Sequence, residues 1–132
     1  MEIRKDIYDQ MVKEAIQSFP KECCGILAGK NKLATKIYSV KNVDPSPETS
    51  YLMESNTQLK ILKTIDKIYI DMVAVYHSHP NSECFPSERD IELISYPECL
   101  NVIISLADID SPEVRAFLIK EKKIIEEQIK II

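Results

Sequence analysis

The feature that most constrains the fold is an apolar run at residues 72–76, which leads directly into the only two histidines of the chain, His77 and His79. A short, continuous apolar run of this kind is typical of a buried strand. Side chains alternate between the two faces of a strand, so His77 and His79 are expected on one face and Ser78 on the other. The sequence therefore predicts a buried strand that presents two imidazoles side by side at its end.

Three other stretches have the spacing of amphipathic helices. The first covers residues 6–18, and Pro20 is expected to end it. The second is expected to begin at Ser55, whose side chain can cap it, and a third, shorter helix is expected to begin at Ser87. Their predicted apolar stripes are, in chain order, Ile7, Met11, Ala15 and Phe19; Leu59, Leu62, Ile65 and Tyr69; and Ile91, Leu93 and Ile94.

Further stretches have the composition of strands. They cover residues 22–29, 33–43, 100–106, 114–119 and 124–132. The first two are expected to pair as a hairpin. The last has features of both a helix and a strand, and we favour a strand after a turn at residues 121–123. Helices that alternate with strands in this order predict an α/β fold, with a mixed β-sheet sandwiched by helices.

Length and composition narrow the classes of protein further. The 132 residues, 45% of them hydrophobic, fit a single domain over residues 1–132, with a surface loop rather than a domain boundary at residues 44–50. The net charge is −4 and no dense cluster of Lys and Arg occurs, so no nucleic-acid partner is expected. No signal-like or membrane-spanning apolar segment occurs either, which predicts a soluble cytoplasmic protein without a membrane partner.

The four cysteines are expected to be reduced thiols. They are Cys23, Cys24, Cys84 and Cys99, and no Cys-x-x-Cys pair occurs among them. Cys23 and Cys24 are expected to pack as small apolar side chains at the start of a strand. Cys84 lies in the loop after the histidines, and the sequence leaves open whether it approaches a metal or is open to oxidation.

The two histidines have a candidate third partner in Asp90, which follows Ser87 by three residues. Two imidazoles and one carboxylate would leave the fourth position of a zinc ion open to water. Such an ion lowers the pKa of bound water from 15.7 toward roughly 7, which makes hydrolysis the natural reaction class. A structural zinc is more often closed by four Cys or His ligands, and the cysteines lack that spacing. We therefore interpret the histidine stretch as an open metal site.

Metal-assisted hydrolysis also needs a group that accepts and delivers protons, and Glu22 is the candidate. It stands at the start of a predicted strand in an apolar setting where a carboxylate is unusual, although a surface position would explain it as well. Ser87 and Asp90 likewise have a structural explanation, because Ser-x-x-Asp at a helix start resembles a capping box. Both interpretations can hold together.

These residues resemble the signature of the JAMM, or MPN-plus, metalloproteases. That signature consists of an upstream Glu, then His-x-His, seven residues, Ser, two residues and Asp, and here it is Glu22, His77, His79, Ser87 and Asp90. The residues around them resemble the stand-alone prokaryotic branch of the family. The match spans residues 22–90, about half of the chain, and a motif of several separated parts is specific.

The resemblance implies a zinc-dependent peptidase or isopeptidase with a cytidine-deaminase-like α/β/α fold. It implies that His77, His79 and Asp90 bind Zn²⁺, that Glu22 is the general acid/base, and that Ser87 stabilises the oxyanion of the tetrahedral intermediate. Cys84 has no counterpart in the signature.

The resemblance also implies a substrate class. Members of the prokaryotic branch act on small ubiquitin-like or sulfur-carrier proteins of β-grasp fold, at or near a C-terminal diglycine, so such a protein is the expected partner. The alternative is a non-catalytic module that binds a ubiquitin-like partner, against which the complete set of residues argues. A nucleoside deaminase would need His-x-Glu with Pro-Cys-x-x-Cys, and neither is present. The sequence leaves the oligomeric state open.

Overall fold

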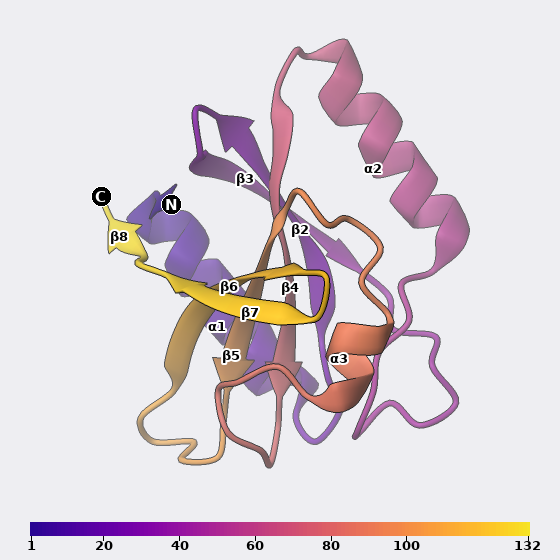
Figure 1. Cartoon of the computed structure of the whole chain (residues 1–132), viewed down its shortest axis with the longest axis vertical. Helices are drawn as coiled ribbons and strands as arrows, with labels where there is room; N and C mark the ends of the chain where they lie inside the picture. The colour runs from indigo at the N-terminus through magenta and orange to yellow at the C-terminus, as the bar shows by residue number, and fades with distance from the viewer.

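A mixed β-sheet of eight strands forms the centre of the protein, as a computed structural model of all 132 residues shows (Figure 1). The strands lie in the order β7-β6-β5-β4-β2-β3-β1-β8. The β1–β3, β1–β8 and β4–β5 pairs are parallel, and the other pairs are antiparallel. The strands are β1 (Glu2–Ile3), β2 (Cys24–Lys30), β3 (Leu33–Val40), β4 (Asp71–His79), β5 (Leu100–Ser105), β6 (Glu113–Lys120), β7 (Lys123–Glu127) and β8 (Lys130–Ile131).

Three helices cover the two faces of this sheet: α1 (Lys5–Ser18), α2 (Ser55–Lys67) and α3 (Glu88–Glu92). The buried side chains of α1 share a core cluster with Tyr76 of β4. Those of α2 share another cluster with Val75, whose side chain leaves β4 on the opposite face. The predicted α/β fold with a mixed sheet sandwiched by helices is therefore confirmed.

The first predicted helix and the strand hairpin after it form as expected. α1 ends at Ser18, directly before Phe19 and Pro20, and β2 pairs with β3 in antiparallel register. Asn31 and Lys32 make the tight turn between these strands with positive φ angles of 53° and 62°, as the twist of a two-residue hairpin requires. Phe19 is largely exposed, so the buried stripe of α1 is shorter than predicted.

The prediction for the second helix is partly wrong. Glu54, not Ser55, caps α2, since its carboxylate accepts hydrogen bonds from the backbone N–H groups of the first turn. Leu59 and Tyr69 were expected to face the core, but they are 51% and 81% exposed. The helix contacts the sheet along a narrower line on which Ile65 is buried, and Tyr69 lies beyond the helix end.

The ambiguous C-terminal segment forms strands, as we favoured. A turn at Glu121 and Lys122 joins β6 to β7, and β8 then pairs with β1 at the far edge of the sheet. The two chain termini consequently lie side by side (Figure 1), and the N-terminal amine donates a hydrogen bond of 3.1 Å to the carbonyl of Gln128. None of the three helices is long and apolar enough to cross a membrane.

Candidate metal centre

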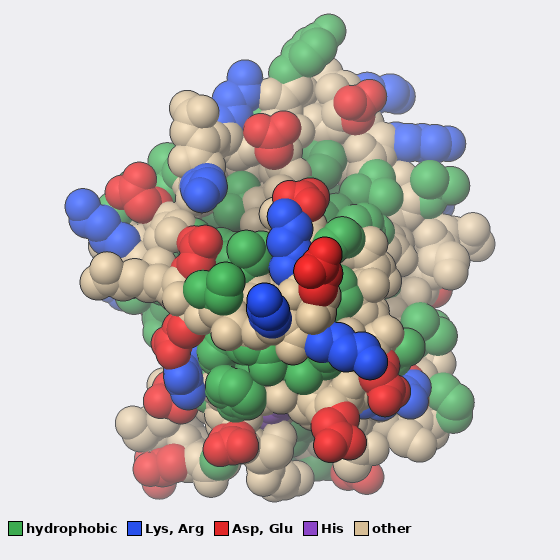
Figure 2. All heavy atoms as spheres, in the orientation of Figure 1, with side chains coloured by type: hydrophobic (Ala, Val, Ile, Leu, Met, Phe, Trp, Pro, Cys, Tyr) green, Lys and Arg blue, Asp and Glu red, His purple; other side chains and the backbone are tan.

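The end of β4 presents both histidines on the sheet face that carries α2 and α3. β4 lies between β2 and β5, so His77 and His79 are only 1% and 4% exposed, and scarcely any histidine surface is visible in Figure 2. Ser78 points to the other face, where its Oγ accepts a hydrogen bond of 2.8 Å from the backbone N–H of Cys23. The alternation predicted for this strand is therefore present.

Asp90 reaches the histidines because it lies in the first turn of α3, three residues after the N-cap Ser87. Ser87 caps this helix: its Oγ accepts a hydrogen bond of 3.1 Å from the backbone N–H of Asp90, and its own N–H donates to Asp90 Oδ2 at 2.9 Å. The predicted capping box is thus confirmed. The cap fixes both the start of the helix and the direction of the carboxylate. Leu93, by contrast, was predicted to point inward and is mostly exposed, because it follows the end of α3.

Three donor atoms converge at this point. The Nε2 atoms of His77 and His79 are 3.0 Å apart, and they lie 3.2 Å and 3.0 Å from Asp90 Oδ2. Donors at about 2.0–2.1 Å from one tetrahedral zinc ion are separated by roughly 3.3 Å, so the three residues fit such an ion with little movement. The group of His77, His79 and Asp90 can therefore hold a metal.

The surroundings of the imidazoles support this interpretation. His79 Nδ1 lies 2.8 Å from the carbonyl oxygen of Glu83, and a hydrogen bond donated by Nδ1–H leaves the Nε2 lone pair free for a metal. The ring of His77 stacks on Tyr51, with centroids 4.6 Å apart. Burial lowers the pKa of His77, which keeps this imidazole in the neutral form that ligates metals.

The Asp90 carboxylate is ionised within this group. Burial opposes its ionisation, but hydrogen bonds with His77 and His79 outweigh burial, and the pKa of Asp90 lies far below its ordinary value. The donor set therefore combines two imidazoles with one anionic oxygen, which is a common zinc ligand set.

Glu22 lies next to this group across the sheet. Cys24 pairs with His77 in the antiparallel register of β2 and β4, and the backbone N–H of Ser78 donates to the carbonyl of Cys23. Glu22 directly precedes Cys23, and its carboxyl is near enough to His79 and Asp90 for their charges to act on it. Its side chain is only 6% exposed, its Oε1 has no hydrogen-bond partner, and burial raises its pKa to about 7. A buried carboxyl that can hold or release a proton near neutral pH thus lies beside the donors.

A network that the sequence did not predict holds Glu22 and α3 in place. The side-chain amide of Asn42 donates to the carbonyls of Glu22 and Ser50, at 3.0 Å each. Arg89 of α3 pairs with the buried carboxylate of Asp44 at 3.3 Å and also bonds the Ser50 hydroxyl. Residues 44–50 are a loop as predicted, yet this loop ties the strand start that carries Glu22 to the helix that carries Asp90. Its partners are too far apart in sequence for any local pattern to reveal them.

The cysteines are separate from the donor group. All four are unpaired thiols, as expected, and Cys23 and Cys24 are buried in the core. The Sγ of Cys84 lies 3.1 Å from the carbonyl of Ile103, in a core cluster with Phe117. The structure thus answers the question that the sequence left open: Cys84 packs in the core and is not one of the metal donors.

Comparisons with known proteins identify the family of the chain. Residues 4–120 match the family described as prokaryotic homologs of the JAB domain. A CysO-cysteine peptidase of Mycobacterium tuberculosis is 31% identical over 132 residues, which cover 98% of this chain and 90% of that protein. A desampylase of Haloferax volcanii is 36% identical over 88 residues, 65% of this chain and 63% of the relative. The solution structure of protein DSY2949 from Desulfitobacterium hafniense is 32% identical with a TM-score of 0.89, over 99% of this chain and 92% of that one.

Proposed function

Because the chain belongs to the prokaryotic homologs of the JAB domain, we propose that it is a metal-dependent peptidase or isopeptidase that acts on protein tails. Its substrate is the C-terminal diglycine tail of a ubiquitin-like or sulfur-carrier protein, and it hydrolyses the bond that joins this tail to an amino acid or to another protein. The names of the relatives, a CysO-cysteine peptidase and a desampylase, support this substrate class. The four unpaired thiols fit a reducing compartment, for which we propose the cytoplasm.

The observation that carries the proposal is the convergence of three donor atoms, 3.0–3.2 Å apart, beside a buried carboxyl. We propose that His77, His79 and Asp90 hold Zn²⁺, because two imidazoles and one carboxylate suit zinc and leave it an open position. A zinc ion bound there supplies Lewis acidity, which makes water nucleophilic near neutral pH and polarises the scissile carbonyl.

The residues of the chain then handle protons and developing charge. Glu22 accepts the proton of the attacking water and delivers it to the departing amine, a role that suits a carboxyl with a pKa of about 7. Ser87 donates a hydrogen bond from its hydroxyl to the oxyanion of the tetrahedral intermediate. This donation is compatible with its cap, because the Oγ only accepts a hydrogen bond from the Asp90 amide and its own proton stays free.

Zinc content and cleavage test the proposal together. Purified protein is expected to bind about one zinc per chain and to cleave a linear fusion to a sulfur-carrier protein that ends in Gly-Gly. Glu22→Gln should retain zinc and lower turnover by roughly two to four orders of magnitude. Glu48→Gln, on the exposed part of the nearby loop, is the matched control and should cleave like the wild type.

Each outcome bears on a different part of the proposal. Zinc-loaded, folded wild type that cleaves no diglycine conjugate would contradict the hydrolase. Unchanged turnover of Glu22→Gln would remove Glu22 from the mechanism. Comparing a linear fusion, a lysine isopeptide and a cysteine adduct of the same carrier would then identify the bond that the enzyme prefers.

A further inference from the structure

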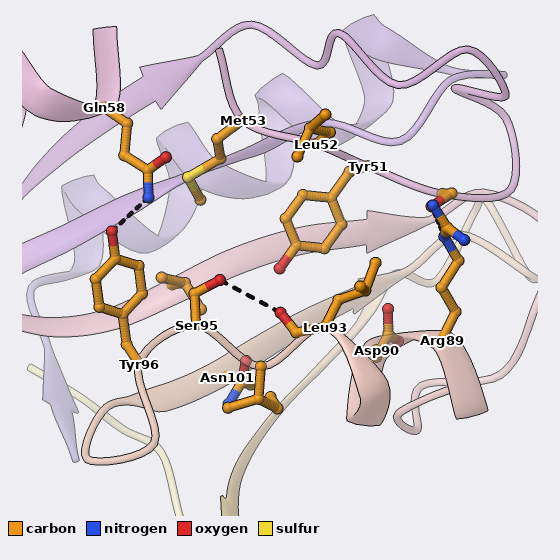
Figure 3. Close-up of a pocket in the computed structure, with 13 residues that line it drawn as sticks. Tyr51, Leu52, Met53, Gln58, Arg89, Asp90, Leu93, Ser95, Tyr96 and Asn101 are labelled. Carbon is orange, nitrogen blue, oxygen red and sulfur yellow. Dashed lines mark hydrogen bonds between the residues drawn. The ribbon is translucent and has the colours of Figure 1, made fainter. Parts of the chain in front are cut away.

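A cavity of about 160 Å³ opens beside the metal-binding residues (Figure 3). It lies between the segment at residues 50–53, the start of α2, the end of α3 with the loop that follows, and β5. Asp90 lines one end, so the cavity borders the candidate metal site. A single water needs only about 10–15 Å³, so the cavity can take a side chain. Its apolar walls are Tyr51, Leu52, Met53, Val75, Leu93, Ile94 and Tyr96.

One polar group in this cavity has no partner. Asn101 of β5 is 6% exposed, and its side-chain amide forms no hydrogen bond within the chain, although it can donate and accept. Two other polar groups that line the cavity have partners: Ser95 Oγ donates to the carbonyl of Leu93 at 3.4 Å, and the Tyr96 hydroxyl accepts a hydrogen bond from Gln58 Nε2. This amide is not among the fully buried polar atoms, so its hydrogen-bonding capacity is open to the cavity and can pair with a ligand there.

A second polar group faces the same space. The hydroxyl of Tyr51 points into the cavity in Figure 3 and has no hydrogen-bond partner in the chain, while its ring stacks on His77. Burial raises the pKa of Tyr51, so its phenol stays neutral and can both donate and accept. The cavity thus combines apolar walls with two uncharged hydrogen-bonding groups.

The distance between Asn101 and the level of His77 along the strands matches the length of two extended glycines. Asn101 pairs with Val75 in the β4–β5 register, and Val75 precedes His77 by two residues. At about 3.3 Å per residue, Asn101 lies roughly 7 Å from the level of His77 along the strands. Two extended glycines span the same distance. With the scissile carbonyl at the metal-binding residues, the first side chain upstream of Gly-Gly falls at the level of Asn101.

We propose that the cavity is a subsite for the residue that precedes the diglycine, and that Asn101 makes it select an uncharged side chain with a hydrogen-bonding end, such as Gln. This inference rests on the proposed function and deepens it. An aliphatic side chain of similar length would pack against the apolar walls of the cavity but leave the amide of Asn101 unpaired. A charged side chain would lose its hydration without gaining a counter-charge, since Arg89 is paired with Asp44 and Asp90 with the histidines.

A set of fusion substrates tests this selection. They are identical except for the residue before Gly-Gly, which is Gln, Leu or Glu. The wild type should cleave the Gln substrate with a kcat/KM about tenfold above that of the Leu substrate, and the Glu substrate should be the poorest. Asn101→Leu should remove or reverse the preference for Gln over Leu. Tyr51→Phe, which keeps the ring on His77, should reduce it.

Two controls separate specificity from folding and from catalysis. Asn56→Leu makes the same change at an exposed position of α2 and should keep the wild-type preference. The affinity of tail peptides for zinc-loaded Glu22→Gln measures the same preference without cleavage. If Asn101→Leu fails to fold or to bind zinc, the reduced preference of Tyr51→Phe still tests the subsite.

The outcomes distinguish this inference from the proposed function. Equal cleavage of all three substrates by the wild type would overturn the subsite while leaving the hydrolase intact. A preference for Gln that persists unchanged in folded, zinc-loaded Asn101→Leu would overturn the role of Asn101. Absence of cleavage together with preferential binding of the Gln peptide would contradict the hydrolase and support the subsite.

Discussion

The two faces of the central sheet are built differently. On the α1 face, 14 buried residues form one continuous core cluster. On the α2 and α3 face, the buried apolar residues form two separate clusters of eight and four. Between them lie the buried polar side chains of Glu22, His77, His79 and Asn101. One face thus supplies packing, and the other places polar groups where water is largely excluded.

Individual polar groups on the two faces show the same contrast. On the α1 face, the Tyr76 hydroxyl donates to Glu14 at 2.7 Å and Ser78 Oγ accepts from Cys23, so both polar groups have partners in the chain. On the other face, Glu22 Oε1 and His77 Nδ1 have none. Polar groups on the packing face are paired within the chain, whereas the second face keeps buried polar atoms without partners in the chain. The following predictions test this division of roles.

The largest expected effect comes from the anionic donor. Asp90→Asn should lower zinc content from about one per chain to a small fraction and slow cleavage by roughly a thousandfold or more, because Lewis-acid activation is worth several kcal/mol. Elemental analysis and kinetic assays measure the two quantities. Glu92→Gln, an exposed change on the same helix, should alter neither. Full zinc content in Asp90→Asn would show that this carboxylate is not a ligand.

A change on the α1 face should lower stability but leave zinc binding and catalysis unchanged. Met11 is fully buried, so Met11→Ala should lower the free energy of unfolding by about 2–5 kcal/mol through lost burial and a cavity. Well below the melting temperature, its zinc content and kcat should match the wild type. Denaturant unfolding and activity per zinc-loaded molecule provide the comparison. A large fall in kcat at full zinc content would show that the two faces are coupled.

Glu22 should make the metal-free fold less stable as pH rises. Its pKa is about 7 in the folded protein against an ordinary 4.5, so between these values the folded state holds a proton that the unfolded state has lost. The resulting penalty is absent below pH 4.5 and complete above pH 7, where it is about 3 kcal/mol. Glu22→Gln should therefore stabilise metal-free protein above pH 7 and have little effect near pH 4. Thermal unfolding with a chelator across this range measures the difference.

Bound zinc should reduce the stabilisation by Glu22→Gln, because a nearby cation favours the ionised carboxyl of Glu22. If metal-free Glu22→Gln and the wild type differ in stability by the same amount at pH 4 and at pH 8, the conclusion that burial raises the pKa of Glu22 is wrong.

The smallest expected effect on stability belongs to Ser87. Ser87→Ala should cost about 1 kcal/mol, because the helix loses its cap. It should also slow the chemical step through loss of the oxyanion donor. Ser87→Thr keeps a capping hydroxyl and should restore stability. Melting curves measure the loss of stability, and single-turnover rates measure the chemical step. If the loss in rate is no larger than the loss of stability accounts for, Ser87 has a purely structural role.

Much of the fold follows from local patterns. The spacing of Ile7, Met11 and Ala15 predicted the buried stripe of α1, and the apolar run before His77 predicted a buried strand. Both are confirmed, because the periods of helices and strands are intrinsic to the backbone. The stripe of α2 was predicted too wide. Leu59 and Tyr69 have the right spacing, but the position of the helix over the sheet, which local pattern does not specify, leaves them exposed.

The sequence by itself determined the donor residues and their local directions. Strand alternation puts His77 and His79 on one face, and the capping box at Ser87 turns Asp90 toward them, because both are effects within a few residues of chain. Only the tertiary structure decided what surrounds them. The register of β2 against β4 brings the start of β2, which Glu22 precedes, beside His77, and Asn101 reaches the cavity through the register of β5. Such registers depend on packing across the whole sheet, which no short segment encodes.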